Sequence, residues 1–393
     1  MTGRVSNHKI AFAPAITLPV LTNERIPKMF VTLSERFDVI PIPLSGLNRI
    51  IYDQKINKFV RYLLFPIDEI GIFFDTLRLS KRNKASLIFA ENAYISLACG
   101  LAAKMLQIPM VWDNHGNVKI YAEAMHKSSI FTRMNILLER VLQNLASKVF
   151  VVSKIDKDAY EQLGFDMGKF LVIPICADLT TVDRNRMNKT EARKSLSIPA
   201  DEKMVLFFGT LNYHPNLEAV VYIAEMLCPE VSKKIDDVHY YIAGGGVYPG
   251  QLPDNVHHIG FVPFSPDLCI WLSAADICIA PLWRGVGVLT KVVDMLSMEK
   301  PSVLSPLCLK GIPELQHDVN CLMGTDEESF AREVVRLLED PALQERLAKG
   351  GRKTIAQGYS WEVIGPRIYD VLESIIEKNE GGHDIHSIDS KLY

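Results

Sequence analysis

The sequence predicts an α/β protein built from two doubly wound parallel sheets. Short apolar runs bounded by turn residues alternate with longer segments of helical period throughout the 393 residues. These runs are continuously hydrophobic, which is typical of parallel strands buried on both faces. The strand pattern is interrupted by the charged segment 180–203 and restarts at residue 204. A chain of this length can form two domains with separate cores, and we place their connection in that segment.

The apolar runs are expected to be strands joined by helical segments. In the first half they cover residues 9–15, 37–44, 85–90, 109–114, 148–153 and 169–175. In the second half they cover residues 203–209, 238–246, 256–262, 275–282 and 301–306. The intervening helices make βαβ units, which pair their strands in parallel. A last helix is expected over roughly 362–377, where apolar residues recur at helical spacing.

One helix start is explicit after the strand at 148–153. Ser153 is expected to cap this helix, with Asp156 three residues on in the capping-box position. Asp156, Lys157 and Asp158 also form an Asp-x-Asp pattern. We interpret this pattern as helix capping and surface charge.

The composition excludes several classes of protein. Hydrophobic residues make up 48% of the chain and charged residues 23%, the balance of a soluble globular protein. The N-terminus lacks a secretory signal pattern, and no stretch has the roughly 18 uncharged apolar residues of a membrane-spanning helix. The seven cysteines form no CxxC or Cys/His cluster, which indicates neither a zinc site nor a disulfide framework. We therefore expect a cytoplasmic protein.

The charge is unevenly distributed along the chain. Residues 1–178 carry 22 Lys and Arg against 16 Asp and Glu, although the whole chain has a net charge of −3. A basic cluster, Arg78, Lys81, Arg82 and Lys84, follows a largely apolar stretch. Such a cluster is typical either of peripheral contact with the anionic inner face of the cell membrane or of an ordinary solvated surface. Both interpretations stay open.

Glycine-containing loops follow three strands of the second half, where α/β sheets bind ligands. The first loop contains Gly209 and Thr210, followed by His214, Pro215 and Asn216. The second is the run 244–246. It is not a dinucleotide fingerprint, because a GxGxxG pattern starting at Gly244 would need glycine where Pro249 stands.

The third loop reads Gly285-Val286-Gly287 and leads into a helix that carries Lys291 and Asp294. Glycines at a strand-to-helix turn let backbone amides approach phosphate oxygens, and the helix dipole favours the anion. Lys291 can reach the same phosphates. Asp294 lies three residues on, hence on the same helix face, where it can accept the hydroxyls of a ribose. Taken alone, this pattern is equally typical of a glycine turn before a buried helix.

One loop of the first half also resembles a site. Asp113, Asn114, His115, Gly116 and Asn117 follow a buried strand, and we expect them to be exposed together. A single histidine is more often structural, but this cluster of polar residues favours a functional loop as much as a structural one.

Taken together, these stretches resemble the family 4 glycosyltransferases, retaining enzymes of the GT-B fold. The matching pieces of the second half, in family order, are "LFFGTLNYHPNLEAV", "YYIAGGG", "VHHIGFVP", "LSAADICIAPLWRGVGVLTKVVDMLSMEKPSV", "GIPELQHDVNCLM" and the tail beginning "DEESFAREVVRLLED". Those of the first half are "IPMVWDNHGNV", "LASKVFVVSKIDKDAYEQLG" and "FLVIPICAD". The resemblance covers roughly residues 85–377.

The resemblance implies a fold and its boundaries. Two Rossmann-like domains would face a central cleft, and the C-terminal helix would cross back to the N-terminal domain. We expect an acceptor-binding domain over 1–182, a nucleotide-sugar-binding domain over 183–360, the crossover helix over 361–379 and a disordered tail over 380–393.

The resemblance also implies residue roles. Lys291 and His115 would be catalytic, with His115 near the transferred sugar and the acceptor. The donor-binding residues would be Gly209, Thr210, His214, Asn216, Gly244, Gly245, Phe261, Val262, Gly285, Gly287, Val288, Leu289, Thr290 and Asp294. Asp113, Asn114 and Asn117 would lie on the acceptor side. No metal ligand is expected.

The sequence departs from the family pattern at the donor loop. Val286 stands where the first of two paired glutamates is usual, and Asp294 replaces the second. The arginine and lysine common in the first glycine loop are absent as well. A subgroup of the family shares Gly-x-Gly-x-x-x-Lys-x-x-Glu, and Lys291 matches its lysine. The first half also lacks the glycine-rich turn usual near the N-terminus.

The resemblance implies an enzyme, a metal-independent glycosyltransferase without cofactor. It would use a UDP- or GDP-linked sugar and a glycan or lipid-linked acceptor, retain the anomeric configuration and bind no nucleic acid. Val286 and Asp294 keep one alternative open, a catalytically inactive protein of this fold that binds a sugar nucleotide or a glycan. A nicotinamide-dependent dehydrogenase is the third interpretation, and the absent fingerprint counts against it.

Overall fold

The computed structural model describes residues 6–14, 25–43, 58–284 and 290–381. The chain divides into two compact units. The first comprises residues 1–119, 127–173 and 365–393, and the second comprises residues 120–126 and 174–364. Of the predicted tail, residues 380 and 381 belong to the last helix, which ends at Gly381, and residues 382–393 lie outside the described residues.

The first unit contains a six-stranded parallel sheet of order β2-β1-β3-β4-β5-β6. Its strands are β1 (Lys9–Ala13), β2 (Asp38–Pro41), β3 (Leu87–Glu91), β4 (Met110–Asn114), β5 (Lys148–Val151) and β6 (Phe170–Val172). β1, β3 and β4 are buried almost completely, as expected for continuously apolar parallel strands. Phe12 stacks on Phe89 in the centre of the sheet, with ring centroids 5.6 Å apart.

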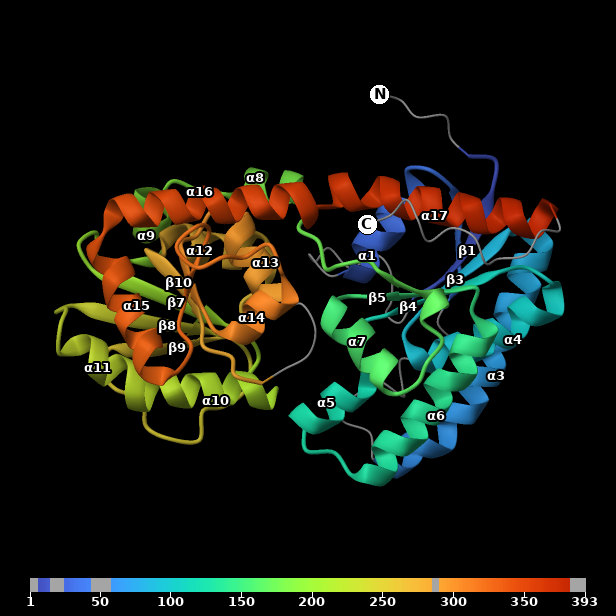
Figure 1. The fold of residues 1–393 in the computed structure, drawn as a ribbon, viewed down its shortest axis with the longest axis horizontal. Coiled ribbons are helices and arrows are strands. Elements are labelled where there is room, and N and C mark those ends of the chain that lie inside the picture. Colours follow the sequence, from blue (N-terminus) through green and yellow to red (C-terminus); the bar gives the residue numbers. More distant parts are fainter. Residues whose placement is uncertain (1–5, 15–24, 44–57, 285–289, 382–393) are drawn as a thin grey trace. The chain divides into compact units, whose positions relative to one another are not determined.

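Helices cover both faces of this sheet (Figure 1). They are α1 (Arg25–Ser34), α3 (Lys58–Asn83), α4 (Ala93–Leu106), α6 (Ser129–Leu145) and α7 (Lys154–Gln162), with a short 3₁₀ turn at Met167–Lys169. The short helix α5 (Val118–Ala124) begins in the first unit, but its residues from Ile120 on belong to the second unit. Ser153 caps α7 by accepting a hydrogen bond from the backbone N–H of Asp156, 3.1 Å away, which confirms the predicted helix start.

The second unit repeats this architecture with the sheet order β12-β11-β10-β7-β8-β9. Its strands are β7 (Lys203–Phe208), β8 (Val238–Ala243), β9 (Val256–Gly260), β10 (Ile277–Ala280), β11 (Ser302–Leu304) and β12 (Leu322–Met323). Its helices include α8 (Leu179–Asn185), α9 (Lys189–Leu196), α10 (His214–Tyr222), α11 (Cys228–Ser232), α12 (Cys269–Ala274), α13 (Thr290–Ser297), α14 (Pro306–Gly311), α15 (Glu327–Glu339) and α16 (Pro341–Gly358). Short π-helical turns occupy Ile223–Leu227 and Phe264–Leu268.

The two helix-covered parallel sheets confirm the predicted two-domain α/β fold. Each expected strand is present, and its ends lie within three residues of the predicted ones. The strand β12 was not predicted, because its two residues show no periodicity. The charged segment 180–203 forms α8 and α9 within the second unit, and the chain passes from one unit to the other after Ile173. The predicted domain limits stay a prediction.

The C-terminal helix α17 (Trp361–Gly381) belongs to both units, and the division falls between Ile364 and Gly365. Its C-terminal part packs on α1 of the first unit. The Tyr369 hydroxyl donates to the carbonyl oxygen of Thr32 at 2.8 Å, and the Arg36 guanidinium pairs with Glu373 at 2.8 Å. The helix therefore returns to the N-terminal unit, as predicted.

Two further expectations concern the whole chain. All seven cysteines are buried free thiols, in agreement with their apolar surroundings in the sequence. Among the helices of the described residues, none combines the length and the hydropathy needed to cross a bilayer.

Candidate functional site

In the second unit, the carboxyl ends of β7 and β8 meet backbone to backbone. The Gly209 N–H donates to the Ala243 carbonyl at 2.8 Å, and the Leu211 N–H donates to the Gly245 carbonyl at 2.7 Å. A side chain at Gly244 would place its Cβ 2.0 Å from the Gly209 carbonyl oxygen. The two loops can approach this closely only because glycine occupies position 244.

Lys291 and Asn216 reach this glycine edge from two helices, α13 and α10. A Cβ at Gly209 would lie 2.7 Å from Lys291 Nζ and 2.6 Å from Asn216 Nδ2, and its φ of +149° also disfavours any other residue. Lys291 Nζ donates to Asn216 Oδ1 at 2.6 Å, and Asn216 Nδ2 donates to the Thr210 carbonyl at 2.9 Å. The structure thus brings together Gly209, Thr210, Asn216 and Lys291, four of the residues that the sequence assigned to one site.

The electrostatics of Lys291 favour an anionic ligand. Its side chain is buried, and Nζ lies 4.2 Å from the centroid of the Phe207 ring. Burial lowers the pKa of Lys291 to about 7, an effect that Cys308 only partly offsets. Among the described residues, no carboxylate forms an ion pair with Lys291. A bound anion would therefore supply the countercharge that this ammonium group lacks.

Asp294 lies on the same helix as Lys291 and is buried. Its backbone carbonyl accepts hydrogen bonds from the Ser297 hydroxyl at 2.8 Å and from the Met298 N–H at 3.0 Å. Lys291 and Asp294 occupy successive turns, as their spacing predicted.

The remaining predicted donor residues are more dispersed. His214 pairs with Glu218 at 3.3 Å, Phe261 is 77% exposed, Val262 is half-buried, and Thr290 is exposed at the start of α13. Gly245 has ordinary space around its Cα, 3.7 Å from the Phe261 Cβ. Gly285, Gly287, Val288 and Leu289, together with Val286, lie outside the described residues.

One residue of this edge escaped the sequence analysis. His258 Nε2 lies 2.7 Å from the carbonyl oxygen of Gly244 and fixes the second glycine loop. Its position in a strand pattern gave no signal, because the contact depends on the pairing of β8 with β9.

The carboxyl edge of the first unit's sheet carries charged side chains instead of glycines. Arg25, the first residue of α1, forms a bidentate pair with Asp113 of β4: Nε donates to Oδ2 at 2.9 Å and Nη2 donates to Oδ1 at 2.8 Å. Both side chains are buried. Bidentate geometry makes this one of the stronger ion-pair arrangements available to a protein.

His115 completes this edge. Its Nε2 lies 3.3 Å from Asp113 Oδ2 and 3.5 Å from Glu91 Oε2, while part of the ring reaches solvent. Burial and the neighbouring Asp113 raise the pKa of Glu91 well above its usual range, although Arg25 acts against them. Burial would also raise the pKa of Asp113, but Arg25 and His115 outweigh it and hold that pKa below the usual range. At this edge the protein therefore favours the neutral form of Glu91 and the ionised form of Asp113.

Glu91 and Arg25 were missed by the sequence analysis. Glu91 ends β3 beside β4, so a search for polar residues at neighbouring strand ends would have found it. Arg25 gave no such signal, since it lies 88 residues from its partner.

The expectation that residues 113–117 are exposed together was wrong. Asp113, Asn114 and Asn117 are buried, and only His115 is exposed. The Asn114 side-chain amide donates to the Tyr160 hydroxyl, and the Asn117 N–H donates to Asp156 Oδ1 at 2.9 Å. These polar groups turn inward because they support the loop that carries His115. Asp156 is likewise buried and interacts with the Ser153 hydroxyl at the helix start, whereas Asp158 pairs with Lys154 at the surface, in agreement with the predicted capping and surface charge.

Among the described residues, Glu91, Asp113 and His115 form a group of potential metal ligands. Their ligand-type atoms lie within 4.8 Å of one another. Arg25, however, occupies both carboxylate oxygens of Asp113. The cluster is therefore already paired within the protein.

Two family models match the chain. Residues 46–181 match the model described as Glycosyltransferase Family 4, and residues 202–340 match the model described as Glycosyl transferases group 1. Together the two segments make up well over half of the chain and contain Glu91, Asp113 and His115 of the first edge and the glycine loops and Lys291 of the second.

Curated relatives match over part of their length. The GDP-mannose-dependent monoacylated alpha-(1-6)-phosphatidylinositol monomannoside mannosyltransferase of Corynebacterium glutamicum is 26% identical over 159 residues, which are 37% of this chain and 42% of the relative. The chain spans about half the length of the curated relatives it matches.

Solved structures share the fold over nearly the whole chain. Sucrose-phosphate synthase from Thermosynechococcus elongatus superposes with a TM-score of 0.74 at 15% identity, covering 94% of this chain and 100% of that one. The Anabaena protein HepE, solved in complex with UDP and glucose, gives a TM-score of 0.69 at 16% identity, with the same coverage. At these identities the likeness concerns the fold alone.

Proposed function

Because the chain belongs to the family 4 glycosyltransferases of the GT-B fold, we propose that it transfers a sugar from a nucleoside diphosphate donor to a glycan or lipid-linked acceptor. One observation carries this proposal. Lys291 is a buried ammonium group at a glycine-walled strand edge, and Asn216, its hydrogen-bond partner, is neutral. This edge suits the diphosphate of a sugar nucleotide better than it suits a neutral ligand.

The chemistry follows from the charges that develop during transfer. Breaking the sugar–phosphate bond leaves negative charge on the departing phosphate oxygen. A preorganised positive group in a site shielded from water is the largest lever a protein has on such a step. We assign this role to Lys291, with the start of α13 and the glycine loops supplying backbone N–H groups. In this proposal the diphosphate needs no metal ion, and the anomeric configuration is retained.

The first unit would bind the acceptor. Asp113 is fixed by Arg25 and in turn holds Nε2 of His115, so the imidazole orientation is determined before any ligand binds. We assign His115 to contact with the transferred sugar and the acceptor. Asp113, Asn114 and Asn117 then act through the position of His115, because their own side chains are buried.

The donor base is proposed to be uridine or guanosine. Support comes from HepE, which was solved with UDP, and from the Corynebacterium relative, whose donor is GDP-mannose. In this proposal the remaining predicted donor residues, His214, Phe261, Val262 and Thr290, line the base and sugar, and Asp294 accepts the ribose hydroxyls. We also propose that the enzyme works at the inner face of the cell membrane, in peripheral contact through its basic residues.

A catalytically inactive protein that binds sugar nucleotides is the second candidate. Val286 and Asp294, which replace the paired glutamates of the family, favour it. It shares donor binding with the proposed enzyme but predicts no turnover.

A panel of nucleotide sugars tests both candidates. A donor present at about 100 times its dissociation constant should stabilise the folded protein by roughly 2.7 kcal/mol, visible as a shift in Tm. With that donor, transfer or donor hydrolysis is then measured for the wild type and for Lys291→Ala. Loss of this charge should lower kcat by about 10²- to 10³-fold.

The matched control is Lys349→Ala, which removes an exposed lysine of the second unit that pairs with Glu345. Its kcat should equal that of the wild type. Equal turnover of Lys291→Ala would refute the assigned role of Lys291. Donor binding without any turnover in the presence and absence of EDTA would favour the inactive binding protein.

A further inference from the structure

Three helices of the first unit form one layer on its sheet. α3 lies between β2 and β3 in the chain, α4 between β3 and β4, and α6 between β4 and β5. These connections all run in the same direction across the sheet, so right-handed crossovers place the three helices on the same face. Direct contacts confirm that they are neighbours. The Thr76 hydroxyl of α3 lies 3.7 Å from the Cys99 thiol of α4, and a Cβ at Gly100 of α4 would lie 3.0 Å from the Leu145 Cβ of α6. Figure 1 shows the three helices side by side.

The outer surface of α3 is apolar and then basic. Ile67, Ile70 and Phe74 recur at helical spacing and are 54%, 57% and 60% exposed. The same stripe continues with Arg78 and Lys81, both exposed. The opposite stripe, which faces α4 and the sheet, is buried and consists of Asp68, Ile72, Thr76 and Ser80. The apolar residues of the outer stripe therefore do not belong to the core.

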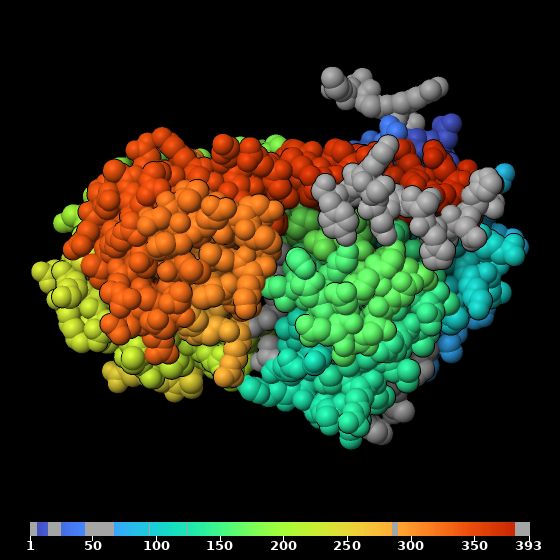
Figure 2. All heavy atoms as spheres, in the orientation of Figure 1, coloured from blue at the N-terminus to red at the C-terminus, as the bar shows by residue number. Residues whose placement is uncertain are grey.

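The neighbouring helices continue this pattern. On α6, Ile130, Met134, Leu137 and Val141 form an outer stripe with exposures of 70%, 67%, 65% and 42%. On α4, Leu101 and Met105 are 46% and 65% exposed. α6 lies at the surface of the first unit in Figure 2. We call this surface the three-helix face, defined by Ile67, Ile70, Phe74, Leu101, Met105, Ile130, Met134, Leu137 and Val141.

The charges around the three-helix face have one sign. Its exposed charged residues within the described part of α3, α4 and α6 are Arg78, Lys81, Arg82, Lys104, Arg133 and Arg140. The acidic residues are withdrawn from it. Asp68 and Glu139 are buried, Asp75 pairs with Arg78 at 3.0 Å, and burial raises the pKa of Glu69 to about 8, so that this group is neutral at pH 7. Within the described residues, six cations thus border the apolar stripes, and of these Arg78 alone has an ion-pair partner.

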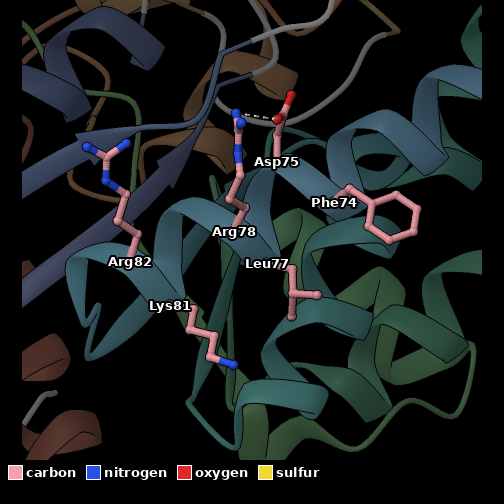
Figure 3. A pocket seen from close by; sticks show the side chains of 6 residues that line it. All are labelled: Phe74, Asp75, Leu77, Arg78, Lys81 and Arg82. Carbon is pink, nitrogen blue, oxygen red and sulfur yellow. Dashed lines mark hydrogen bonds and ion pairs between the residues drawn. The ribbon is translucent and has the colours of Figure 1, made fainter.

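A hollow of about 510 Å³ lies where the apolar and basic parts of α3 meet. Phe74, Leu77, Arg78, Lys81 and Arg82 line it, together with Asp75, whose ion pair with Arg78 is drawn in Figure 3. An apolar wall beside three basic side chains matches the two parts of an anionic lipid, the acyl chain and the phosphate headgroup.

We propose that the three-helix face docks on an anionic lipid bilayer, with its apolar stripes entering the interface and its basic residues contacting phosphate headgroups. Amphipathic helices of this composition bind in the interfacial plane of membranes. A symmetric dimer through the same face would oppose cations to cations, because such an interface is self-complementary. The docking rests on the proposed function only in that a lipid-linked acceptor would lie in the same membrane.

Vesicle co-sedimentation of the full chain tests the proposal. The wild type should bind vesicles of phosphatidylglycerol and phosphatidylcholine at least tenfold more tightly than vesicles of phosphatidylcholine alone. Phe74→Ser combined with Met134→Ser, and separately Arg78→Gln combined with Lys81→Gln, should each weaken binding to the anionic vesicles about tenfold. High salt should reduce the contribution of Arg78 and Lys81 to binding more than that of Phe74 and Met134.

The matched control is Val31→Ser, which removes a 49% exposed apolar residue of α1, outside the three-helix face. It should bind vesicles as the wild type does. Binding of the two double variants equal to that of the wild type, or no binding by the wild type, would overturn the proposal. So would a dimer in sedimentation velocity that Phe74→Ser converts to a monomer. Donor-induced Tm shifts, measured on the same variants, separate a failure of docking from a failure of the proposed transferase function.

Discussion

The carboxyl edge of the second unit's sheet presents backbone and one buried cation, whereas that of the first presents two carboxyl groups, an arginine and a histidine. In the second unit, glycines at 209 and 244 keep side chains out, and Lys291 has a neutral partner. In the first, Arg25 pairs with Asp113, and burial beside Asp113 favours the uncharged form of Glu91 by raising its pKa. The first edge is electrostatically complete without a ligand, and the second is not. Two copies of one architecture therefore suit different ligands: a neutral hydroxyl group at the first edge and an anion at the second.

The largest expected effect concerns the neutral state of Glu91. Since the pKa of Glu91 is higher in the folded than in the unfolded protein, the contribution of Glu91 to stability is fully present below the unfolded value of about 4.3 and is lost as pH rises above it. Glu91→Gln imitates the neutral acid and removes this loss. Relative to the wild type, its free energy of unfolding should rise by up to about 1.4 kcal/mol per pH unit between pH 5 and 7. Urea denaturation at both pH values measures the difference.

Asp113→Asn is the matched control for Glu91→Gln. It removes the buried carboxylate that pairs with Arg25, so it should destabilise the protein by about 3–5 kcal/mol at pH 7. If the two variants changed the free energy of unfolding in the same way, the two carboxyl groups would carry the same charge. The contrast between a neutral Glu91 and an ionised Asp113 would then be wrong.

The second effect concerns the glycine edge. In Gly244→Ala the new Cβ meets the Gly209 carbonyl, so β7 and β8 must separate at their ends. The expected loss is about 1–3 kcal/mol of unfolding free energy, typical of forced overpacking. Gly245→Ala is the neighbouring control, because its Cβ would make an ordinary contact at 3.7 Å. Thermal unfolding of the two variants should therefore differ, and equal Tm values would show that the close approach of the loops is unimportant.

The sequence predicted much of this comparison, but unequally for the two edges. The eleven apolar runs became strands because continuous hydrophobicity follows directly from burial on both faces. Gly209, Asn216 and Lys291 were also predicted, since each is part of a local loop or helix-start pattern. Arg25 and Glu91 were not, because their roles arise from contacts between distant segments. The exposure of residues 114 and 117 was mispredicted for the same reason: their partners, Tyr160 and Asp156, lie on α7.

The smallest expected effect is the one closest to function, the pH dependence of donor binding. With a pKa of about 7 in the unliganded protein, Lys291 is charged below pH 7 and neutral above it. The diphosphate of a sugar nucleotide favours the charged form, so binding above pH 7 must take up a proton. The affinity should be constant below pH 7 and fall by up to about tenfold per pH unit above it, equivalent to about 1.4 kcal/mol.

Isothermal titration with a nucleotide sugar between pH 6 and 9, in two buffers of different ionisation enthalpy, measures both the affinity and the proton uptake. Lys291→Met should bind more weakly at pH 6 and show no dependence on pH, because a methionine of similar length carries no proton. It should also keep the wild-type fold, since an apolar side chain next to Phe207 avoids the cost of burying an ammonium group. A wild-type affinity that is constant from pH 6 to 9 would mean that Lys291 is charged throughout. In that case the second edge would already supply a countercharge, and its contrast with the first edge would disappear.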